Sequence, residues 1–195
     1  MTTWGVSAQG HDAAIAVFHH NNELVFAAHA ERYSRVKNDP QLNLPIVMEA
    51  LRFGEPEKIV WYEDQGLKWV RRAFTRTFNK NKQELSPAKY MQQFYTKKVS
   101  HKFVKHHRSH AAAGYYTSPF TDATIIVIDA IGEWETFTIW SGKGKKLKKE
   151  YAKWYPNSLG LWYSAMTQRC GLIPNEHEYI LMGMAALGSS RTWRL

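Results

Sequence analysis

The sequence predicts an α/β fold in which helices flank a mixed β-sheet. Short apolar runs open the chain at residues 4–8, 14–18 and 23–30, separated by a Gly-His-Asp loop and an Asn-Asn turn. A later run, residues 124–129 (TIIVID), is continuously apolar and has the length of a buried strand. Because strands come first and are then mixed with helices, an α/β domain with a mixed sheet is favoured.

Residues typical of helix starts and ends occur along the rest of the chain. Pro45 and Gly54 bracket a helix over residues 44–53, and Ser86-Pro87 separates two helices at 66–78 and 87–98. Three further helices are predicted at 106–116, 158–169 and 178–187. The remaining predicted strands are 58–62, 102–105, 135–140 and 147–154.

Length and composition restrict the class of protein. The 195 residues suffice for one buried domain or for one lobe of a larger enzyme. No apolar run is long enough to span a bilayer, and Gln9, His11 and Asp12 interrupt any signal-peptide core. The single cysteine, Cys170, cannot form an intrachain disulfide, so a reducing compartment, most simply the cytoplasm, is expected.

The positive charge is concentrated in one stretch. The formal net charge is +9, and residues 66–108 contain twelve Lys or Arg against one acidic residue, Glu84. Such a surface attracts nucleotides and other anions. Aromatic residues such as Trp69 and Phe74 interleave with the basic ones, so a nucleic-acid-binding module is an alternative interpretation, although no standard RNA-binding signature is present.

The HHRSH segment is the sharpest chemical signal. His106 and His110 are four residues apart and share one face of the predicted helix, while Asp129 ends an apolar strand. Two imidazoles and one carboxylate suit Fe(II), Zn or Mn. The competing interpretation is a solvated basic patch.

Three loops carry further candidates, each with a plainer alternative. His11 can act as a general base that Asp12 orients, although pattern alone favours an ordinary β-turn. Basic residues of the next loop can hold phosphate or can simply be solvated; they are Arg32, Arg35 and Lys37. The segment of Gly132 and Glu133 either binds a ligand, whose close approach Gly132 permits, or is simply a hairpin loop.

Six motifs in order resemble the O-carbamoyltransferase family, which modifies antibiotics and nodulation factors. They are G-H-D-A-A at 10–14, A-E-R-Y-S-R-V-K at 30–37, H-H-R-S-H-A-A-A at 106–113, D-A-I-G-E-W-E-T at 129–136, S-L-G-L-W-Y-S at 158–164 and E-Y-I-L-M-G-M-A-A-L-G at 178–188. The resemblance implies an actin-like ATPase fold made of ribonuclease-H-like lobes. This chain would be a single partial domain over residues 1–195, the N-terminal part of the carbamoyl-transfer domain.

The resemblance also implies a chemistry. Carbamoyl phosphate and ATP give carbamoyl adenylate, whose carbamoyl group then moves to an acceptor hydroxyl. The positions that bind iron in the family match His106, His110 and Asp129, and the acceptor-side loop matches His11 and Asp12. The family's basic loop matches Arg32, Arg35 and Lys37.

The chain departs from the family at three places. Ala130 stands where the family usually has Gly, and Ile180-Leu181 stand where the family commonly has Lys-Val. The last residues do not resemble the family's continuation. We therefore expect the second lobe and the adenylate-forming domain to be absent from this sequence. It is then a fragment, a split-gene product whose partner chain supplies them, or the product of a decayed gene. A metal-binding remnant without catalysis is the remaining alternative.

Overall fold

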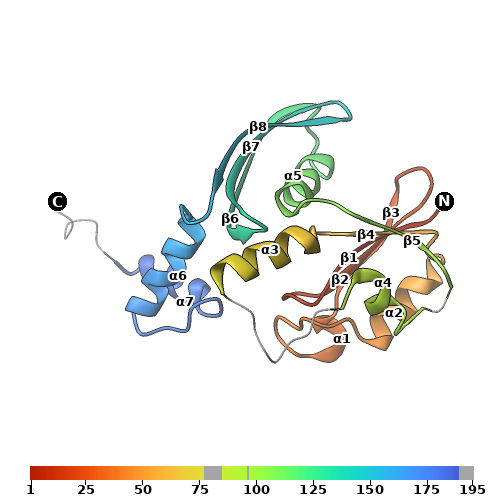
Figure 1. The fold of residues 1–195 in the computed structure, drawn as a ribbon, viewed down its shortest axis with the longest axis horizontal. Coiled ribbons are helices and arrows are strands. Elements are labelled where there is room, and N and C mark those ends of the chain that lie inside the picture. Colours follow the sequence, from red (N-terminus) through yellow and green to blue (C-terminus); the bar gives the residue numbers. More distant parts are fainter. Residues whose placement is uncertain (77–84, 96, 189–195) are drawn as a thin grey trace. The chain divides into compact units, whose positions relative to one another are not determined.

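The chain divides into two compact units. The computed structural model describes residues 1–76, 85–95 and 97–188, and its contacts group into Met1–Ser109 and His110–Leu195. The division falls inside one continuous helix, α5 (His106–Tyr116) (Figure 1). Whether both units belong to one partial domain of a longer enzyme stays a prediction.

The first unit contains a five-stranded mixed sheet, which confirms the predicted α/β class. The strand order is β3-β2-β1-β4-β5 (Figure 1). Strand β2 is antiparallel to both β1 and β3, whereas β4 runs parallel to both β1 and β5. The strands are β1 (Thr3–Ser7), β2 (Ala14–Phe18), β3 (Leu24–His29), β4 (Lys58–Trp61) and β5 (Ser100–Phe103).

The core of the first unit lies on one face of this sheet. Alternate residues of β1, β2 and β4 are buried, as the two-residue period of a strand requires. Helix α2 (Leu44–Arg52) begins at Asn43, whose side chain accepts a hydrogen bond from Ile46 N, and buries Ile46, Val47 and Ala50. The other helices of this unit are α1 (Glu31–Ser34), α3 (Gln65–Thr75), α4 (Pro87–Met91) and the first turn of α5.

The second unit is built on an antiparallel sheet of order β6-β7-β8. Its strands are β6 (Asp122–Gly132), β7 (Glu135–Lys143) and β8 (Lys146–Trp154), and they are followed by α6 (Leu159–Arg169) and α7 (Glu178–Ala185). Helix α5 packs on the sheet where Ala111 meets Val127 and Trp140. Tyr115 fixes the helix end, because its hydroxyl donates to Thr121 O at 2.8 Å or to Gly144 O at 3.1 Å.

Two helix predictions differ from the structure. The helix predicted over residues 87–98 ends at Met91, and Tyr95 and Lys97, which lie beyond its end, both hydrogen-bond to Glu55. The helix predicted over 66–78 is α3, and its last two predicted positions, 77 and 78, lie outside the described residues.

Two other predictions are wrong. The segment of Arg32, Arg35 and Lys37 is not only a loop, because α1 occupies its start. The run at 124–129 is not a buried strand: Ile126 and Ile128 are 58% and 57% exposed, since they lie on the sheet face opposite the one that α5 covers. Within the described part of the chain, no helix has the length and apolar character needed to cross a membrane.

Candidate metal centre

Helix α5 presents two histidines one turn apart. His106 and His110 are the first and fifth residues of the helix, so their side chains lie on one face. The helix can approach β6 closely because its residue at the contact, Ala111, is small and fully buried against Val127. Local sequence thus places the imidazoles beside this strand.

Asp129 of β6 completes a cluster of three side chains that could hold a metal ion. His110 Nε2 lies 3.8 Å from Asp129 Oδ2, and the ligand atoms of His106, His110 and Asp129 all lie within 4.8 Å of one another. His106 and Asp129 are half-buried and His110 is exposed. Ligand atoms about 2 Å from one ion fit this spacing, and the open side leaves coordination positions for a substrate.

The backbone around Asp129 departs from regular strand pairing. The register of β6 against β7 is continuous to Ile128 and resumes only at Gly132. Within this gap, Ala130 N donates to Asp129 Oδ1 at 2.7 Å, which fixes one carboxylate oxygen. The prediction that the strand ends at Asp129 is therefore wrong by three residues, but the regular ladder does stop just before it.

Two residues at the start of α6 hold the Asp129 segment. Ser158 Oγ lies 2.7 Å from Ala130 O and 3.2 Å from Asp129 O, and it also caps α6 by accepting from Leu161 N. At Gly160 a Cβ atom would lie 2.6 Å from Ala130 N. The pattern at 158–164 was identified in the sequence, but this close approach was not.

Tyr62 anchors the first turn of α5 and was missed in the sequence. Its carbonyl oxygen accepts from Ser109 Oγ at 3.0 Å, and its ring lies edge-on to His106 with centroids 5.7 Å apart. The fully buried His107 fixes the same turn. The signal available in the sequence was position, since Tyr62 directly follows a parallel strand at its carboxyl end.

The His11–Asp12 loop lies against Tyr62. A Cβ atom at Gly10 would be 2.9 Å from Tyr62 Oη, so glycine is needed for the approach. His11 Nδ1 lies 2.7 Å from Asp12 Oδ2, and the His11 side chain is 80% exposed. A carboxylate at Nδ1 leaves Nε2 directed to solvent, which is the arrangement of an oriented general base.

The predicted phosphate loop is joined to this loop by backbone hydrogen bonds. Ala13 N donates to Asp39 O at 2.8 Å, and Asp12 N lies 3.5 Å from Asn38 O. Arg32 lies 3.8 Å from Glu31, and Arg35 adopts a left-handed conformation at the end of α1. Arg32, Arg35 and Lys37 lie at the surface of this segment, and their phosphate-binding role stays a prediction.

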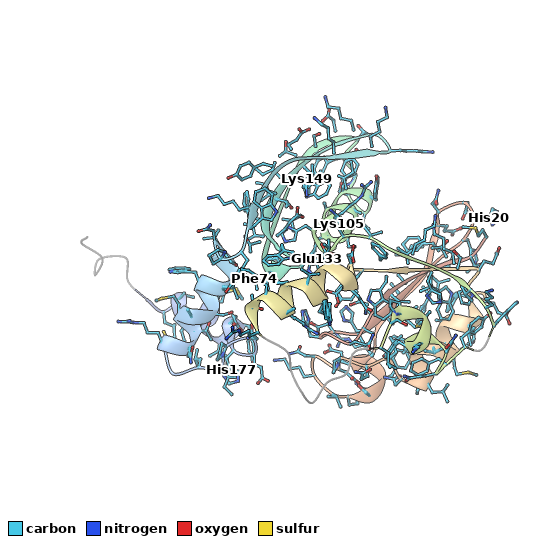
Figure 2. The ribbon with its side chains drawn as sticks, in the orientation of Figure 1. His20, Phe74, Lys105, Glu133, Lys149 and His177 are labelled. Carbon is cyan, nitrogen blue, oxygen red and sulfur yellow. The ribbon has the colours of Figure 1, made fainter. Side chains whose placement is uncertain are left out.

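Gly132 and Glu133 belong to the β6–β7 turn. Gly132 pairs with Glu135, and Glu133 is buried with a φ of 53°. The hairpin interpretation of these residues therefore describes their backbone. Figure 2 shows Glu133 near the end of this hairpin. Their contact with a ligand stays a prediction.

The basic stretch at residues 66–108 also contains a buried lysine. Lys68 Nζ lies 2.6 Å from Glu63 Oε1, and both side chains are buried. On the same helix Trp69 and Phe74 are 62% and 75% exposed, and Figure 2 labels Phe74. Nucleic-acid binding by α3 is untested.

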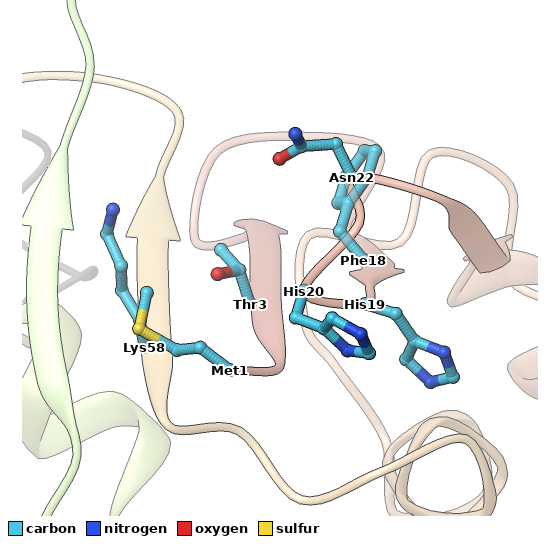
Figure 3. Close-up of a pocket in the computed structure, with 7 residues that line it drawn as sticks. All are labelled: Met1, Thr3, Phe18, His19, His20, Asn22 and Lys58. Atoms are coloured by element: carbon cyan, nitrogen blue, oxygen red, sulfur yellow. The ribbon is translucent and has the colours of Figure 1, made fainter.

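A separate open pocket of about 300 Å³ contains none of these candidates. It lies at the other end of the first sheet, where β1 and β4 begin at Thr3 and Lys58 (Figure 3). Its lining is Met1, Thr3, Phe18, His19, His20, Asn22 and Lys58.

Comparison with known proteins identifies the chain's relatives. A family model described as "Carbamoyltransferase N-terminus" matches residues 2–193. The uncharacterized protein sll1178 of Synechocystis sp. is 31% identical over 214 aligned residues, which cover 96% of this chain and 35% of that protein. The chain thus spans about a third of the length of this curated relative.

A solved structure of the Aquifex aeolicus member of the Ppx/GppA protein family is also similar. It is 12% identical, with a TM-score of 0.37, over 85% of this chain and 54% of that one. A likeness this weak carries no argument about function.

Proposed function

Because the chain belongs to the family of carbamoyltransferase N-termini, we propose that it forms the metal-holding part of an enzyme that transfers a carbamoyl group to an acceptor hydroxyl. The observation that carries the proposal is the convergence of His106, His110 and Asp129 within 4.8 Å, in a chain whose family match covers residues 2–193. The sheet order β3-β2-β1-β4-β5 supports a ribonuclease-H-like lobe of an actin-like ATPase fold for the first unit.

The proposed substrate is carbamoyl adenylate, made from carbamoyl phosphate and ATP by a domain outside this chain. A divalent ion, which we propose to be Fe(II), supplies Lewis acidity at the carbonyl or phosphate oxygen. His106, His110 and Asp129 would hold this ion. The partner is the rest of the enzyme, on the same chain or another one.

His11 and Asp12 serve the acceptor in this proposal. The acceptor hydroxyl attacks the carbamoyl carbon, its proton passes to His11 Nε2, and AMP leaves with the bonding electrons. Asp12 orients the imidazole through the 2.7 Å contact at Nδ1. Arg32, Arg35 and Lys37 attract the anionic nucleotide, because all three are cations at the surface of the loop joined to this one.

The test is metal content after anaerobic purification. We expect about one Fe(II) per wild-type chain, and an affinity lower by about 10-fold or more in His106→Ala and His110→Ala, since each loses a ligand. His20→Ala is the matched control, because His20 is exposed in the turn before β3. Equal metal content in the four proteins, or none in any, would contradict the assignment of this site.

A further inference from the structure

Helix α3 turns apolar side chains outward and a charged side chain inward. Trp69, Val70 and Phe74 are 62%, 50% and 75% exposed, and Figure 2 labels Phe74. On the side of the helix opposite Val70, Lys68 is buried and its Nζ lies 2.6 Å from Oε1 of the buried Glu63. A surface helix of a globular protein ordinarily has the reverse arrangement, with its apolar face on the core. The reversal indicates that this side of α3 is an interaction surface.

The outward-facing residues of α3 form one contiguous surface. Residues four apart are neighbours on a helix, so Gly66, Val70 and Phe74 form one row. Trp69 and Ala73 form a second row beside it. All five residues are exposed, and together they are called the outer face of α3. The middle of this outer face is aliphatic, and an aromatic ring lies at each side of it.

Arginines border the outer face of α3 on both sides. Arg71 lies three residues before Phe74, which makes the two side chains neighbours. Arg72 lies three residues after Trp69, at the other border of the face. Residues 66–76 contain four Lys or Arg and no Asp or Glu. The charge around the outer face therefore complements a negatively charged partner.

We propose that the outer face of α3 binds the surface of a membrane that contains anionic lipids. A helix that lies in the interface of a bilayer has this composition, with Trp or Phe on the apolar face and Lys or Arg beside the lipid phosphates. Burial of the apolar side chains and attraction of the arginines to the headgroups both favour the bound state. Lipid binding by α3 requires nothing of the metal centre, so this proposal and the proposed function can fail separately.

A single-stranded nucleic acid fits the outer face of α3 less well. Such a ligand needs cations that follow its phosphates and rings on which its bases stack. The centre of the outer face is instead aliphatic, at Val70 and Ala73, and the arginines lie only at its borders. Binding of an oligonucleotide rather than lipid through this face would therefore contradict the proposal.

The test is co-sedimentation of the 195-residue chain with vesicles of phosphatidylcholine, with and without phosphatidylserine. We expect binding to the vesicles that contain phosphatidylserine, weakened by added salt because salt screens the attraction. A second measurement uses vesicles whose acyl chains carry bromine, which quenches tryptophan fluorescence on contact. We expect quenching in the wild type, and its loss in Trp69→Phe, which keeps an aromatic ring at this position.

Substitutions locate the contact. Val70→Glu/Phe74→Glu should lower the partition coefficient by about 10–100-fold, because the burial of two apolar side chains is lost. Phe120→Glu/Leu187→Glu is the control: it adds the same charge at apolar positions that are 65% and 90% exposed outside α3, and it should bind like wild type.

Four results would overturn the proposal. They are binding that phosphatidylserine does not increase, quenching that persists in Trp69→Phe, a double substitution in α3 that binds like wild type, and a control that loses binding equally. A dimer of this chain that is lost in the α3 double substitution would also overturn it, because a second copy would then cover the outer face. If the glutamate variant of α3 does not fold, the quenching of wild type against Trp69→Phe decides.

Discussion

Gly160→Ala tests how the Asp129 segment is held. The added Cβ would lie 2.6 Å from the Ala130 backbone, whereas ordinary contacts begin at 3.4 Å. The start of α6 or the segment 129–130 has to move by about 0.8 Å, the difference between these distances. Overpacking of this kind costs about 1–3 kcal/mol of unfolding free energy. We expect the metal affinity of the His106–His110–Asp129 site to fall by about 10–100-fold, because its supporting contacts shift.

Urea denaturation measures the stability, and Fe(II) titration under anaerobic conditions measures the affinity. Gly183→Ala is the control: Gly183 lies in α7, and a Cβ atom added there would meet no described atom within 4 Å. That change should stabilise α7 by up to about 1 kcal/mol and leave metal binding unchanged. If Gly160→Ala behaves like this control in both assays, the reasoning about close packing on Ala130 is refuted.

Three further changes probe the first unit. Lys68→Met removes the ammonium group that pairs with the buried Glu63 carboxylate. It should lower the free energy of unfolding by about 3–5 kcal/mol, measured by urea denaturation. Tyr90→Phe removes the hydroxyl that accepts from the buried Leu42 N at 2.7 Å; we expect a loss of about 1–3 kcal/mol in the same assay, and an unchanged midpoint would contradict it. Burial lowers the pKa of His101 below its ordinary 6.5, so the neutral form stabilises the fold above that pH. This stability is lost as the pH falls through the folded-state pKa. In thermal melts at several pH values, the melting temperature of His101→Gln should therefore fall less on acidification than that of the wild type.

The elements of the candidate site could be predicted because their signals are local. A four-residue spacing on a helix brings His106 and His110 together whatever surrounds them. Likewise Asn43 and Pro45 fix the start of α2 through capping and a preset backbone angle. Such features depend on neighbours within one turn.

The supporting residues could not be predicted, because their roles depend on contacts between distant segments. Gly160 matters through Ala130, thirty residues earlier, and Gly10 matters through Tyr62. The exposure of Ile126 depends on what packs on its face of the β6-β7-β8 sheet, which its own apolar sequence does not reveal. Hydrophobicity predicted that the strand is suited to burial, and the elements that pack on its two faces decide whether it is buried.

The interrupted pairing after Ile128 separates the part of β6 that packs in the sheet from the part that carries the Asp129 carboxylate. Up to Ile128, each side chain of β6 is committed to one face of the sheet by its register against β7. At Asp129 that alternation no longer fixes direction. Ala130 N donates to the carboxylate, and the Ser158 hydroxyl contacts the backbone carbonyl of Asp129. The packing residues of the sheet can therefore diversify between homologous proteins without turning the Asp129 carboxylate, which we propose as a metal ligand, and its orientation can be adjusted without repacking the sheet.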